Sequence, residues 1–513
     1  MNYLSVQHLL REVAQANAAR GFLILPQTQS RVSFGEFARL AERVAAALAG
    51  CGLPRGGRVA TLFLNGSPSA VSLLGILSAG GVAVPLNPAL GQAEIDALAD
   101  QVGATFLLTE PRHLADHPAL AASAEPLEVD GLDLLLIRRR VTASDAASAD
   151  PGRPLSHRDL AVIFFTSGTT GRPRGVMLTH GNILHNAAFI NQAHQLTPRD
   201  VALCVLPMYH VNGFVVTLLA PLMGRLPVIL PEKFSATHFW EWVRDYRATW
   251  FSAVPTIFSI LLAKTEAGAH DVSSLRFARS ASAPLPPAVL AEFERRTGVP
   301  VIETYGASEA GGQITSNPLP PLVHKPGSAG QAVGNHLEIV DPHKRPLPPG
   351  QVGQVRLAGP NISPGYYQDP QATAAAFRDG WFYTGDLGRL DEDGYVFLTG
   401  RLKDVINRGG EKIAPREIED VIYLLPQVQD AVVAGVPDAT LGEEIAVFLV
   451  ARDHCSLTIQ QVVEHCAGRL PAFKVPRHVH FVPEVPRAAA GKIQRRRLRE
   501  MYPQAWDAKG VTL

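Results

Sequence analysis

Helix-like and strand-like segments alternate along much of the chain. The helix-periodic run 34–50 is followed by a short apolar run at 58–65, a second helical segment at 69–80 and another apolar run at 81–87. Short runs that are apolar throughout and separated by helices are typical of parallel strands covered on both faces. The alternation therefore predicts an α/β fold built on parallel sheets.

The same alternation continues to residue 306. Further apolar runs predict buried strands at 160–165, 200–207, 225–231, 248–255, 275–281 and 300–306. Residues 122–157 are rich in Ala, Ser and Asp, and we expect a surface connection there. From residue 350 the pattern changes, because the Gly-punctuated runs 350–367 and 394–401 are typical of antiparallel strands.

The last part of the chain has a pattern of its own. A helical segment at 415–425 and two later apolar runs make an α+β unit of domain size. With 513 residues, 46% of them hydrophobic, the chain is long enough for two domains with separate cores. We predict an N-terminal domain, residues 1–402, and a C-terminal domain, residues 403–513.

Charge and cysteine content limit the classes of partner. Lys and Arg total 47, and Asp and Glu also total 47, so no overall field favours nucleic acid or an anionic membrane. Four scattered cysteines are too few for a disulfide framework and lack the ligand spacing of structural zinc sites. The sequence contains no apolar run long enough to predict a membrane span, and its first 21 residues are unlike a signal peptide. We expect a cytoplasmic protein.

Small, hydroxyl and basic residues are concentrated in residues 164–182, which read FFTSGTTGRPRGVMLTHGN. Glycine lets a loop backbone approach a ligand, hydroxyls donate hydrogen bonds and arginine adds positive charge. The pattern predicts a polyphosphate cradle, although a Thr-rich surface turn has a similar composition. It matches neither G-x-x-x-x-G-K-[ST] nor G-x-G-x-x-G. The candidate residues are Thr166, Ser167, Gly168, Thr169, Thr170, Gly171, Arg172, Arg174 and Gly175.

Five motifs occur in order across nearly the whole chain: FTSGTTGRPRGVMLTH, YGASEA, YTGDLG, GRLKDVINRGGEKIAPREIE and GKIQRR. Together they resemble the adenylate-forming superfamily of acyl-CoA synthetases, luciferases and peptide-synthetase adenylation domains. The resemblance implies a large N-terminal domain of stacked, mostly parallel sheets with helices and a small β-barrel-like subdomain, followed by a small mobile α+β domain. It also implies a two-step reaction. A carboxylate attacks the α-phosphate of ATP and releases pyrophosphate, and a nucleophile such as the CoA thiol then captures the acyl adenylate.

The resemblance implies contacts to the nucleoside. Asp386 and Arg401 match the two ribose contacts of the family, and Tyr305 matches the residue that stacks on adenine. The other side of the ring is matched by Ser282, Ala283 and Pro284. Taken alone, each of the first three has an ordinary alternative: a local cap for Asp386, a surface ion pair for Arg401 and a core position for Tyr305.

The resemblance also implies contacts to the phosphates. Glu309 matches the acid that holds Mg²⁺, and Ser308 stands where the family usually has Thr, which keeps the hydroxyl. Lys492 matches the lysine that reaches the α-phosphate and the attacking carboxylate, although alone it reads as an exposed lysine. Arg174 replaces the usual Lys, and as a cation it can still bind phosphate oxygens.

In the family, the small domain rotates between the two half-reactions about a hinge that corresponds to Lys403. Rotation would remove Lys492 and bring Gly409 and Gly410 beside the pantetheine arm of CoA, where glycine permits close approach. A simple hairpin turn would use the same two glycines. Three cations are candidates for the CoA phosphates, although such residues are also common on solvated surfaces: Arg408, Lys412 and Lys474.

The acid pocket of the family is lined from three segments, which here supply His210, Asn212, Ala281, Gly306, Ala307, Gly311 and Gly312. His210 matches an aromatic gate position, although a lone histidine is more often a core residue. The run 315–334 resembles short-acid, oxalate-type CoA ligases. Gly311 and Gly312 replace bulkier polar residues of those enzymes, and we expect them to open space. Arg279 either anchors a second carboxylate or belongs to a buried structural pair.

The resemblance favours a carboxylic acid:CoA ligase that uses ATP, Mg²⁺ and CoA. Amino acids are disfavoured, because the segment MYHV lacks the Asp that holds their ammonium group. Transfer of the adenylate to an amine, loading of a carrier protein and a non-enzymatic role stay open, as does a homodimer. A hydrolase is disfavoured, because GASEA is close to a G-x-S-x-G elbow but is followed by sequence broken by Gly and Pro.

Overall fold

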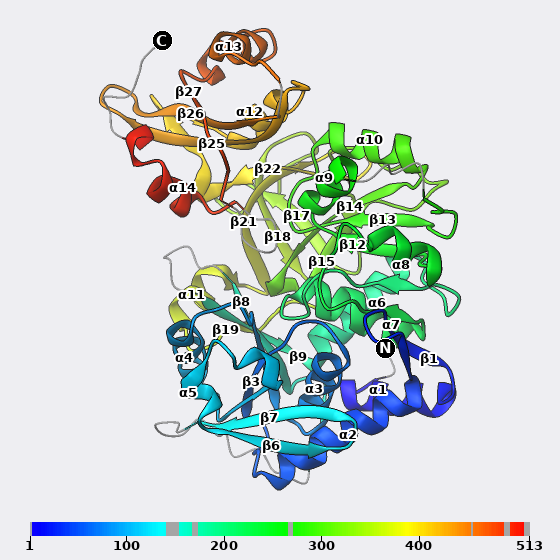
Figure 1. Ribbon diagram of the computed structural model, residues 1–513. Coiled ribbons are helices and arrows are strands. Elements are labelled where there is room, and N and C mark those ends of the chain that lie inside the picture. Colours follow the sequence, from blue (N-terminus) through cyan, green and yellow to red (C-terminus); the bar gives the residue numbers. More distant parts are fainter. Residues whose placement is uncertain are drawn as a thin grey trace.

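The computed structural model of the protein describes residues 3–139, 153–166, 173–264, 270–452, 455–486 and 493–506, without the side chains of 495 and 496. Within these residues the strands form four sheets, one of nine strands, one of eight and two of five. Two large sheets and a small antiparallel sheet make up the N-terminal part, and the C-terminal part lies at one end of the molecule (Figure 1). This architecture confirms the predicted fold class.

The largest sheet has a parallel centre and antiparallel edges. In spatial order its strands are β16 (Gln331–Ala332), β15 (Gly312–Ser316), β14 (Val301–Ala307), β13 (Phe277–Ser280), β12 (Trp250–Ala253), β10 (Ala202–Leu203), β11 (Val228–Ile229), β1 (Gly21–Leu25) and β2 (Ser30–Ser33). The strands β10 to β13 fall within the apolar runs that predicted them, and β14 extends one residue beyond its run, so these predictions are confirmed.

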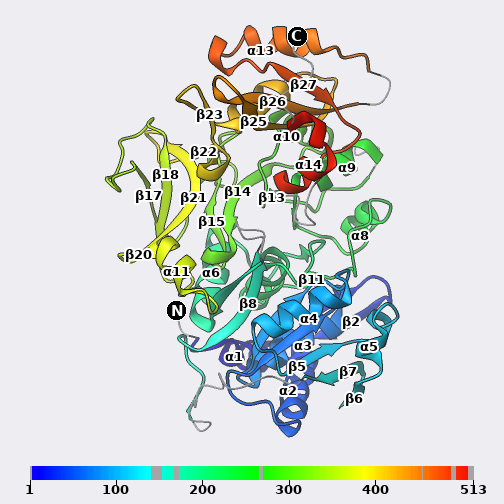
Figure 2. The ribbon, with the colours of Figure 1, turned by 90° about the vertical axis from the view of Figure 1, so that its left-hand side faces the viewer.

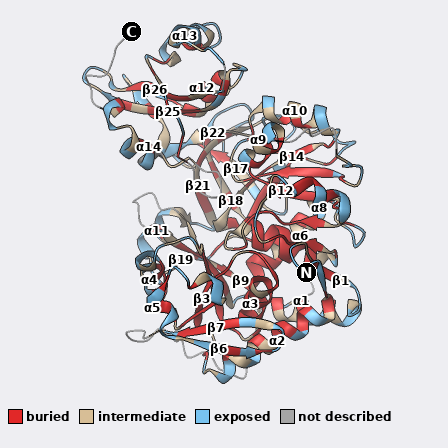
Figure 3. Ribbon diagram, in the orientation of Figure 1, coloured by how far each residue is buried: buried red, intermediate tan, exposed pale blue. Residues whose placement is uncertain are grey.

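Helices cover both faces of this sheet. On one face, Phe239, Phe258 and Phe293 form an aromatic cluster that joins the strands to α8 (Phe239–Asp245), α9 (Pro255–Lys264) and α10 (Pro287–Thr297). The other face packs on α6 (His180–Ala193), the π-helix η2 (Asn212–Leu219) and α7 (Ala220–Gly224). The central strands are buried on both sides (Figure 3), which explains why they are apolar throughout rather than alternating.

The second large sheet is also parallel at its centre. In spatial order it contains β19 (Gly365–Tyr366), β9 (Arg174–Thr179), β8 (Leu160–Thr166), β4 (Val82–Leu86), β3 (Arg58–Leu62), β5 (Phe106–Thr109), β7 (Leu132–Arg138) and β6 (Ala124–Val129). One face packs on α1 (Val6–Asn17), α2 (Phe34–Gly50) and α3 (Ser67–Ser78), and the other on α4 (Gln92–Gln101) and α5 (Pro118–Ala121). α2 has the predicted bounds, because the Ser33 hydroxyl caps its first turn by accepting from the backbone N–H of Glu36.

The prediction of a surface connection at 122–157 is wrong for its first half. Residues 124–138 form the antiparallel hairpin β6–β7 at the edge of the second sheet, with Gly131 in the turn at a φ of 80°. Leu127, Leu134 and Leu136 are buried against the core that includes α2. The overall Ala, Ser and Asp composition concealed this short apolar alternation. Residues 140–152 lie outside the described part of the chain.

A small antiparallel sheet follows, as the Gly-punctuated runs predicted. It contains β17 (His336–Val340), β18 (Gly353–Ala358), β21 (Trp381–Leu390), β20 (Phe377–Arg378) and β22 (Val396–Arg401). Its inner face shares one hydrophobic cluster with Tyr305, Ala310 and Ile314 of the largest sheet. The small sheet is therefore held directly against the carboxyl end of β14.

The C-terminal part has a sheet and cores of its own. It is built from β23 (Ile406–Arg408), β24 (Glu411–Ile413), α12 (Pro415–Ile422), β25 (Val428–Asp438), β26 (Gly442–Ala451), α13 (Ile459–Ala467), β27 (His478–Phe481) and α14 (Arg495–Met501). α12 and α13 pack on one face of the sheet and α14 on the other. Figure 2 shows α13 and α14 on the two sides of this sheet. Separate clusters of buried residues support the prediction that this part is a domain. No helix in the described residues is long and apolar enough to cross a membrane.

Candidate active site

The carboxyl ends of β13 and β14 lie at the kind of sheet edge where open α/β proteins bind ligands. Beyond β13, Ser282 has a φ of 74°, in a region that residues other than glycine rarely adopt. Such backbone strain is concentrated at ligand sites, which supports the prediction that the segment 281–284 faces a ligand. Beyond β14, Ser308–Ala310 form a 3-10 turn that leads into β15. A strand thus follows Ser308, whereas a hydrolase elbow would continue into a helix.

Three glycines shape the turn between β14 and β15. A Cβ on Gly306 would lie 2.2 Å from the carbonyl oxygen of Gly312, so the close pairing of these strands requires glycine. Gly311 and Gly312 have positive φ values of 68° and 129°. A Cβ on Gly312 would lie 3.0 Å from Asn186 Oδ1. A side chain at Gly311 or Gly312 would therefore meet α6. The open space expected beside these two glycines is not found in that direction.

Asp386 lies where β14, β21 and β22 meet. Its carboxylate accepts a hydrogen bond from the Tyr305 hydroxyl at 2.5 Å and forms an ion pair with Arg401 at 2.9 Å. Asp386 and Arg401 are direct partners in the pairing of β21 with β22. Burial, followed by the charge of Asp386, raises the pKa of Tyr305 well above its ordinary value, so this hydroxyl is a donor at neutral pH. The structure thus brings together three residues that the sequence assigned to the nucleoside.

Tyr305 and Arg401 differ in detail from the sequence expectations. Tyr305 is buried in the cluster that joins the small sheet to β14, so it occupies the core position that was considered as an alternative to stacking. Arg401 forms an ion pair, but with Asp386 rather than with an unrelated surface group. The negative charge of Asp386 is the main cause that raises the pKa of Arg401.

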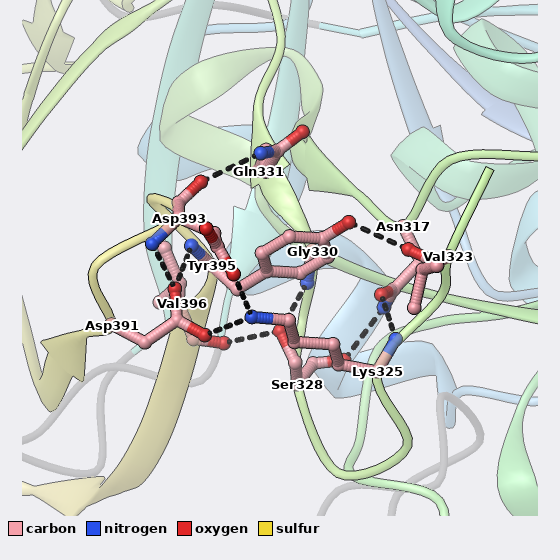
Figure 4. Close-up of polar contacts among 10 residues, drawn as sticks. All are labelled: Asn317, Val323, Lys325, Ser328, Gly330, Gln331, Asp391, Asp393, Tyr395 and Val396. Atoms are coloured by element: carbon pink, nitrogen blue, oxygen red, sulfur yellow. Dashed lines mark hydrogen bonds and ion pairs between the residues drawn. The ribbon is translucent and has the colours of Figure 1, made fainter.

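The loop 317–331 holds the turn between β21 and β22 in place (Figure 4). Lys325 Nζ lies 2.6 Å from Asp391 Oδ2 and 2.7 Å from Asp393 Oδ2, and it stands over the Tyr395 ring at 4.4 Å. The Tyr395 hydroxyl donates to the Val323 carbonyl oxygen at 2.6 Å. The hairpin that carries Asp386 and Arg401 is therefore attached to the segment that follows β15.

Buried Asn317 organises the loop itself. Its Nδ2 donates to the carbonyl oxygens of Ser328, at 2.7 Å, and Glu303, at 3.1 Å, and its Oδ1 accepts from the Lys325 backbone N–H at 3.1 Å. Ser328 Oγ donates to the Val396 carbonyl oxygen at 3.0 Å. One amide side chain thus connects β14, the loop and, through Ser328, the start of β22.

Glu309 and Arg174 lie on the two sides of Tyr366. The Tyr366 hydroxyl donates to Glu309 Oε1 at 2.9 Å, and the Arg174 guanidinium stands 5.5 Å from the centre of the Tyr366 ring. Arg174 Nε also lies 3.6 Å from Asp369 Oδ2. Burial, followed by the charge of Glu309, raises the pKa of the Tyr366 hydroxyl. An acid and a cation that the sequence assigned to the phosphates are thus joined through one tyrosine.

The tip of the predicted phosphate loop, from Ser167 to Arg172, lies outside the described residues, as do Gly491 and Lys492. Thr166 and Arg174 close the described base of the loop as partners in the pairing of β8 with β9. Gly175 faces the interior, because a Cβ there would lie 2.9 Å from Ile163 Cγ2. It serves strand packing, and the expected role in backbone approach to a ligand is not supported. The segment GVMLT belongs to β9.

Polar side chains gather around Asn212, one of the residues that the sequence assigned to the acid pocket. Asn212 begins η2, and its Oδ1 accepts from Ser252 Oγ at 3.0 Å and from Arg279 Nη1 at 3.3 Å. Ala281, directly after β13, is buried. His210 lies two residues before Asn212, with its ring centre 4.7 Å from that of Tyr209. The structure therefore brings Asn212 and Arg279 together.

The C-terminal candidates are mostly engaged elsewhere. Gly409 and Gly410, with φ values of 59° and 94°, form the two-residue turn between β23 and β24, which is the hairpin alternative. Arg408 forms a two-pronged ion pair with buried Glu444, at 2.6 and 2.9 Å, and Lys474 Nζ lies 2.6 Å from Glu417. These two cations therefore have structural partners, whereas Lys412 is exposed. Lys403 lies in the 3-10 turn Leu402–Asp404, directly after Arg401.

Sequence reasoning missed three residues of the candidate site. Tyr366 and Lys325 act through contacts to residues far away in the chain, and Gln313 contacts Arg279 from β15 of the same sheet. A tyrosine directly after a glycine turn, as in PGYY, was the available signal for Tyr366. No local pattern marks Lys325 or Gln313.

Comparison with known proteins gives a consistent result. The family of AMP-binding enzymes matches residues 10–367, and its C-terminal domain matches residues 417–492. Sulfoacetate–CoA ligase of Cupriavidus necator is 37% identical, over 93% of this chain and 94% of its own. Oxalate–CoA ligase of Arabidopsis thaliana is 38% identical, over 89% and 91%. The crystal structure of ATP-bound MatB from Rhodopseudomonas palustris superimposes with a TM-score of 0.87 at 31% identity, over 98% of this chain and all of that one.

Proposed function

Because the chain belongs to the family of AMP-binding enzymes and is an ATP-dependent acid–CoA ligase, we propose that it activates a short carboxylic acid at the site between β14, β21 and β9. The observation that carries this placement is the pair of clusters around Asp386 and Glu309. One presents a buried carboxylate with a tyrosine and an arginine, and the other an acid and a cation that share a tyrosine.

Asp386 holds the ribose of ATP. A carboxylate has about four lone-pair positions, so it can accept from both ribose hydroxyls while it keeps Tyr305 and Arg401. Tyr305 and Arg401 fix the orientation of the carboxylate before ATP binds. The adenine lies beside the strained segment at Ser282, Ala283 and Pro284.

The triphosphate extends from Ser308 towards Arg174 and the loop 166–172. Ser308 donates to the α-phosphate, and Arg174 neutralises the β- and γ-phosphates, because a guanidinium can bond two phosphate oxygens at once. Tyr366 sets the distance between Arg174 and Glu309.

Glu309 fits a magnesium site. The described residues contain no group of three or more His, Cys, Asp or Glu side chains that could hold an ion alone. Mg²⁺ is commonly held by one or two carboxylates, waters and substrate phosphates, and one glutamate beside the triphosphate satisfies that requirement. When bound, Mg²⁺ supplies charge that stabilises the phosphates as pyrophosphate leaves.

Two half-reactions follow. A carboxylate oxygen of the acid forms a bond to the α-phosphorus as the bond to the bridging oxygen of pyrophosphate breaks, and Lys492 stabilises the charge on both partners. The CoA thiolate then forms a carbon–sulfur bond with the acyl group, and AMP leaves with the electrons of the carbon–oxygen bond. Between these steps the C-terminal domain turns about Lys403, which withdraws Lys492 and brings the turn at Gly409 and Gly410 to the acyl group.

A pyrophosphate-release assay over a panel of acids, with and without CoA, tests the proposal. We expect pyrophosphate with the correct acid alone and a thioester, identified by mass, once CoA is added. Absence of ATP consumption with every acid would reject the function. An amide formed from a panel of amines, with no thioester from CoA, would replace CoA by an amine as acceptor.

The cytoplasmic location and the homodimer are further parts of the proposal. The low number of cysteines and the absence of a disulfide pattern support a reducing compartment. Cell fractionation and light scattering of the purified protein test these two points.

A further inference from the structure

Arg279 is a buried cation that has only neutral partners. It is among the largest fully buried side chains, with 2% of its surface exposed. Its Nη1 donates to Ser252 Oγ at 2.8 Å and to Asn212 Oδ1 at 3.3 Å, and its Nε to Gln313 Oε1 at 3.4 Å. Among the described residues, no carboxylate forms an ion pair with it. Buried charges in proteins are normally paired, so this guanidinium needs an explanation.

Arg408 of the same chain shows the usual solution. The partner of Arg408 is the buried carboxylate of Glu444, which accepts from the guanidinium through both of its oxygens. At Arg279, burial alone lowers the pKa to about 9, and no acid restores it. The side chain stays positively charged at neutral pH, and its charge is not balanced.

A neighbour of Arg279 carries a buried hydrogen-bond donor that has no acceptor among the described residues. Gln313 Oε1 accepts from Arg279 and lies 3.1 Å from His194 Nε2, while its Nε2, although fully buried, has no hydrogen-bond partner. Burial lowers the pKa of His194 to about 3, so this histidine is neutral and supplies no charge. The cluster thus contains a cation and a free amide donor, and it lacks both a negative charge and an acceptor.

The place of the cluster connects it to the acid pocket. Ser252 and Arg279 are the penultimate residues of β12 and β13, at the carboxyl edge of the sheet where ligands bind. Asn212 begins a π-helix, a rare element that is frequent at functional sites. Arg279 precedes Ala281 by two residues of extended chain, or about 7 Å. A second group on the acid that reaches this cluster therefore lies only a few bonds from the reacting carboxylate, which favours a short acid.

We propose that Arg279 and Gln313 bind the far end of the acid, and that the substrate is a short acid with a second small anionic group, a carboxylate or a sulfonate. This inference rests on the proposed function, because it uses the same pocket. One carboxylate faces the α-phosphate of ATP, while the second anionic group accepts from the Arg279 guanidinium and from Gln313 Nε2. Asn212 and Ser252 hold the guanidinium in place.

Matched pairs of acids test the inference on the unmodified enzyme. Malonate is compared with propionate, succinate with butyrate, and sulfoacetate with acetate, by pyrophosphate release and thioester formation. We expect kcat/KM to be at least about tenfold higher for the two-anion member of at least one pair, as one or two charge-assisted hydrogen bonds predict. Equal or better use of the one-anion members would overturn the inference while leaving the proposed function intact. No pyrophosphate with any acid would reject the function itself.

Substitution of Arg279 separates substrate binding from a structural role. Arg279→Met should lower kcat/KM much more for the two-anion member of each pair than for the one-anion member, and so remove the preference for two-anion acids. Arg279→Lys should keep part of the preference, because it keeps the charge. An equal loss for both acids of a pair would assign Arg279 to structure alone.

The matched control is Arg276→Met. Arg276 lies three residues earlier and is paired with Asp200, so its removal should not change the preference. Thermal unfolding reports whether each variant folds. If Arg279→Met does not fold, Gln313→Leu, which removes the free donor, should lower the preference for two-anion acids, and an unchanged preference would overturn the inference.

Discussion

In the proposed site, the single side chain of Asp386 serves both stability and binding. Its two oxygens are occupied by Tyr305 and Arg401, yet each keeps a lone pair for a ribose hydroxyl. The residues that orient the carboxylate come from β14 and β22, so its geometry is set before any ligand is present. Preorganised groups of this kind lose little entropy on binding.

Replacement of Asp386 by Asn should weaken ATP binding. The amide has a single neutral acceptor oxygen to offer the ribose hydroxyls, and it places no negative charge beside Arg401, so we expect the KM for ATP to rise by about 10- to 100-fold. Pyrophosphate release at saturating acid measures this. The control is Asp341→Asn, because Asp341 forms an ion pair with Arg345 on the surface. An unchanged KM for ATP would contradict the role of Asp386.

Lys492→Ala should separate the two half-reactions. If the lysine stabilises charge only during adenylation, pyrophosphate release should fall by at least about 100-fold. Thioester formation from a supplied acyl adenylate and CoA should be nearly unchanged. Equal loss of both steps would show that Lys492 has a different role.

At this scale, the sequence predicted residues whose chemistry is local to a motif. Asp386, Arg401 and Glu309 were identified because they stand in short motifs that resemble those of the adenylate-forming superfamily. The partners of these residues were not found, since Tyr366 and Glu309 are 57 positions apart and meet only in the folded chain. The surplus of donors around Arg279 likewise results from tertiary packing.

The elements differ in how far their own sequence determines them. α2 was predicted with its bounds, because an amphipathic pattern and a Ser cap act within the helix itself. The hairpin β6–β7 was missed, because its buried leucines stand among residues typical of loops. No strand was predicted at β9, because its residues directly follow the Gly- and Thr-rich loop and were counted with that loop.

The part of the loop that precedes β16, residues 317–330, has no regular structure and is fixed by side chains. Asn317 is its centre, with three hydrogen bonds to backbone groups. We expect Asn317→Ala to lower the free energy of unfolding by about 2 to 3 kcal/mol, because buried carbonyl groups lose their donors. Urea denaturation measures the change.

Gln331→Ala is the control for Asn317→Ala. Gln331 is exposed and donates one hydrogen bond, at 2.8 Å, to the Asp393 carbonyl oxygen at the same junction. Its removal should change stability by less than about 0.5 kcal/mol. Comparable losses for the two variants would show that Asn317 has no special place in the loop.

In the whole molecule, the C-terminal part touches the N-terminal part near the active site. α12 packs against β22, the strand that ends at Arg401. Glu303, two residues before Tyr305 on β14, lies within the field of Arg416 and Asp420 of α12. The division into two domains was predicted because the pattern of helices and strands changes after residue 402. The contact of α12 with β22 could not be predicted, because it depends on how the two parts pack and no short sequence motif marks it.

Glu303 should make stability depend on pH. Burial raises its pKa from 4.5 to about 7, with Asp420 and Glu294 adding to the increase and the Gly327 N–H and Arg416 opposing it. Between these pH values the folded protein holds a proton that the unfolded chain releases, so this group makes stability fall as pH rises from 4.5 to 7. We expect Glu303→Gln to raise the melting temperature at pH 8 and to change it much less at pH 5. The same shift at both pH values would contradict this role.

The position of Glu303 has a consequence for the proposed rotation. Turning the C-terminal domain would take Arg416 and Asp420 away from this carboxyl and admit water to it, so its affinity for hydrogen ions would drop. Acidic solutions would then favour the arrangement described here and alkaline ones the turned arrangement. In such an enzyme, the pH of the solution would shift the equilibrium between the two domain arrangements, one for each half-reaction.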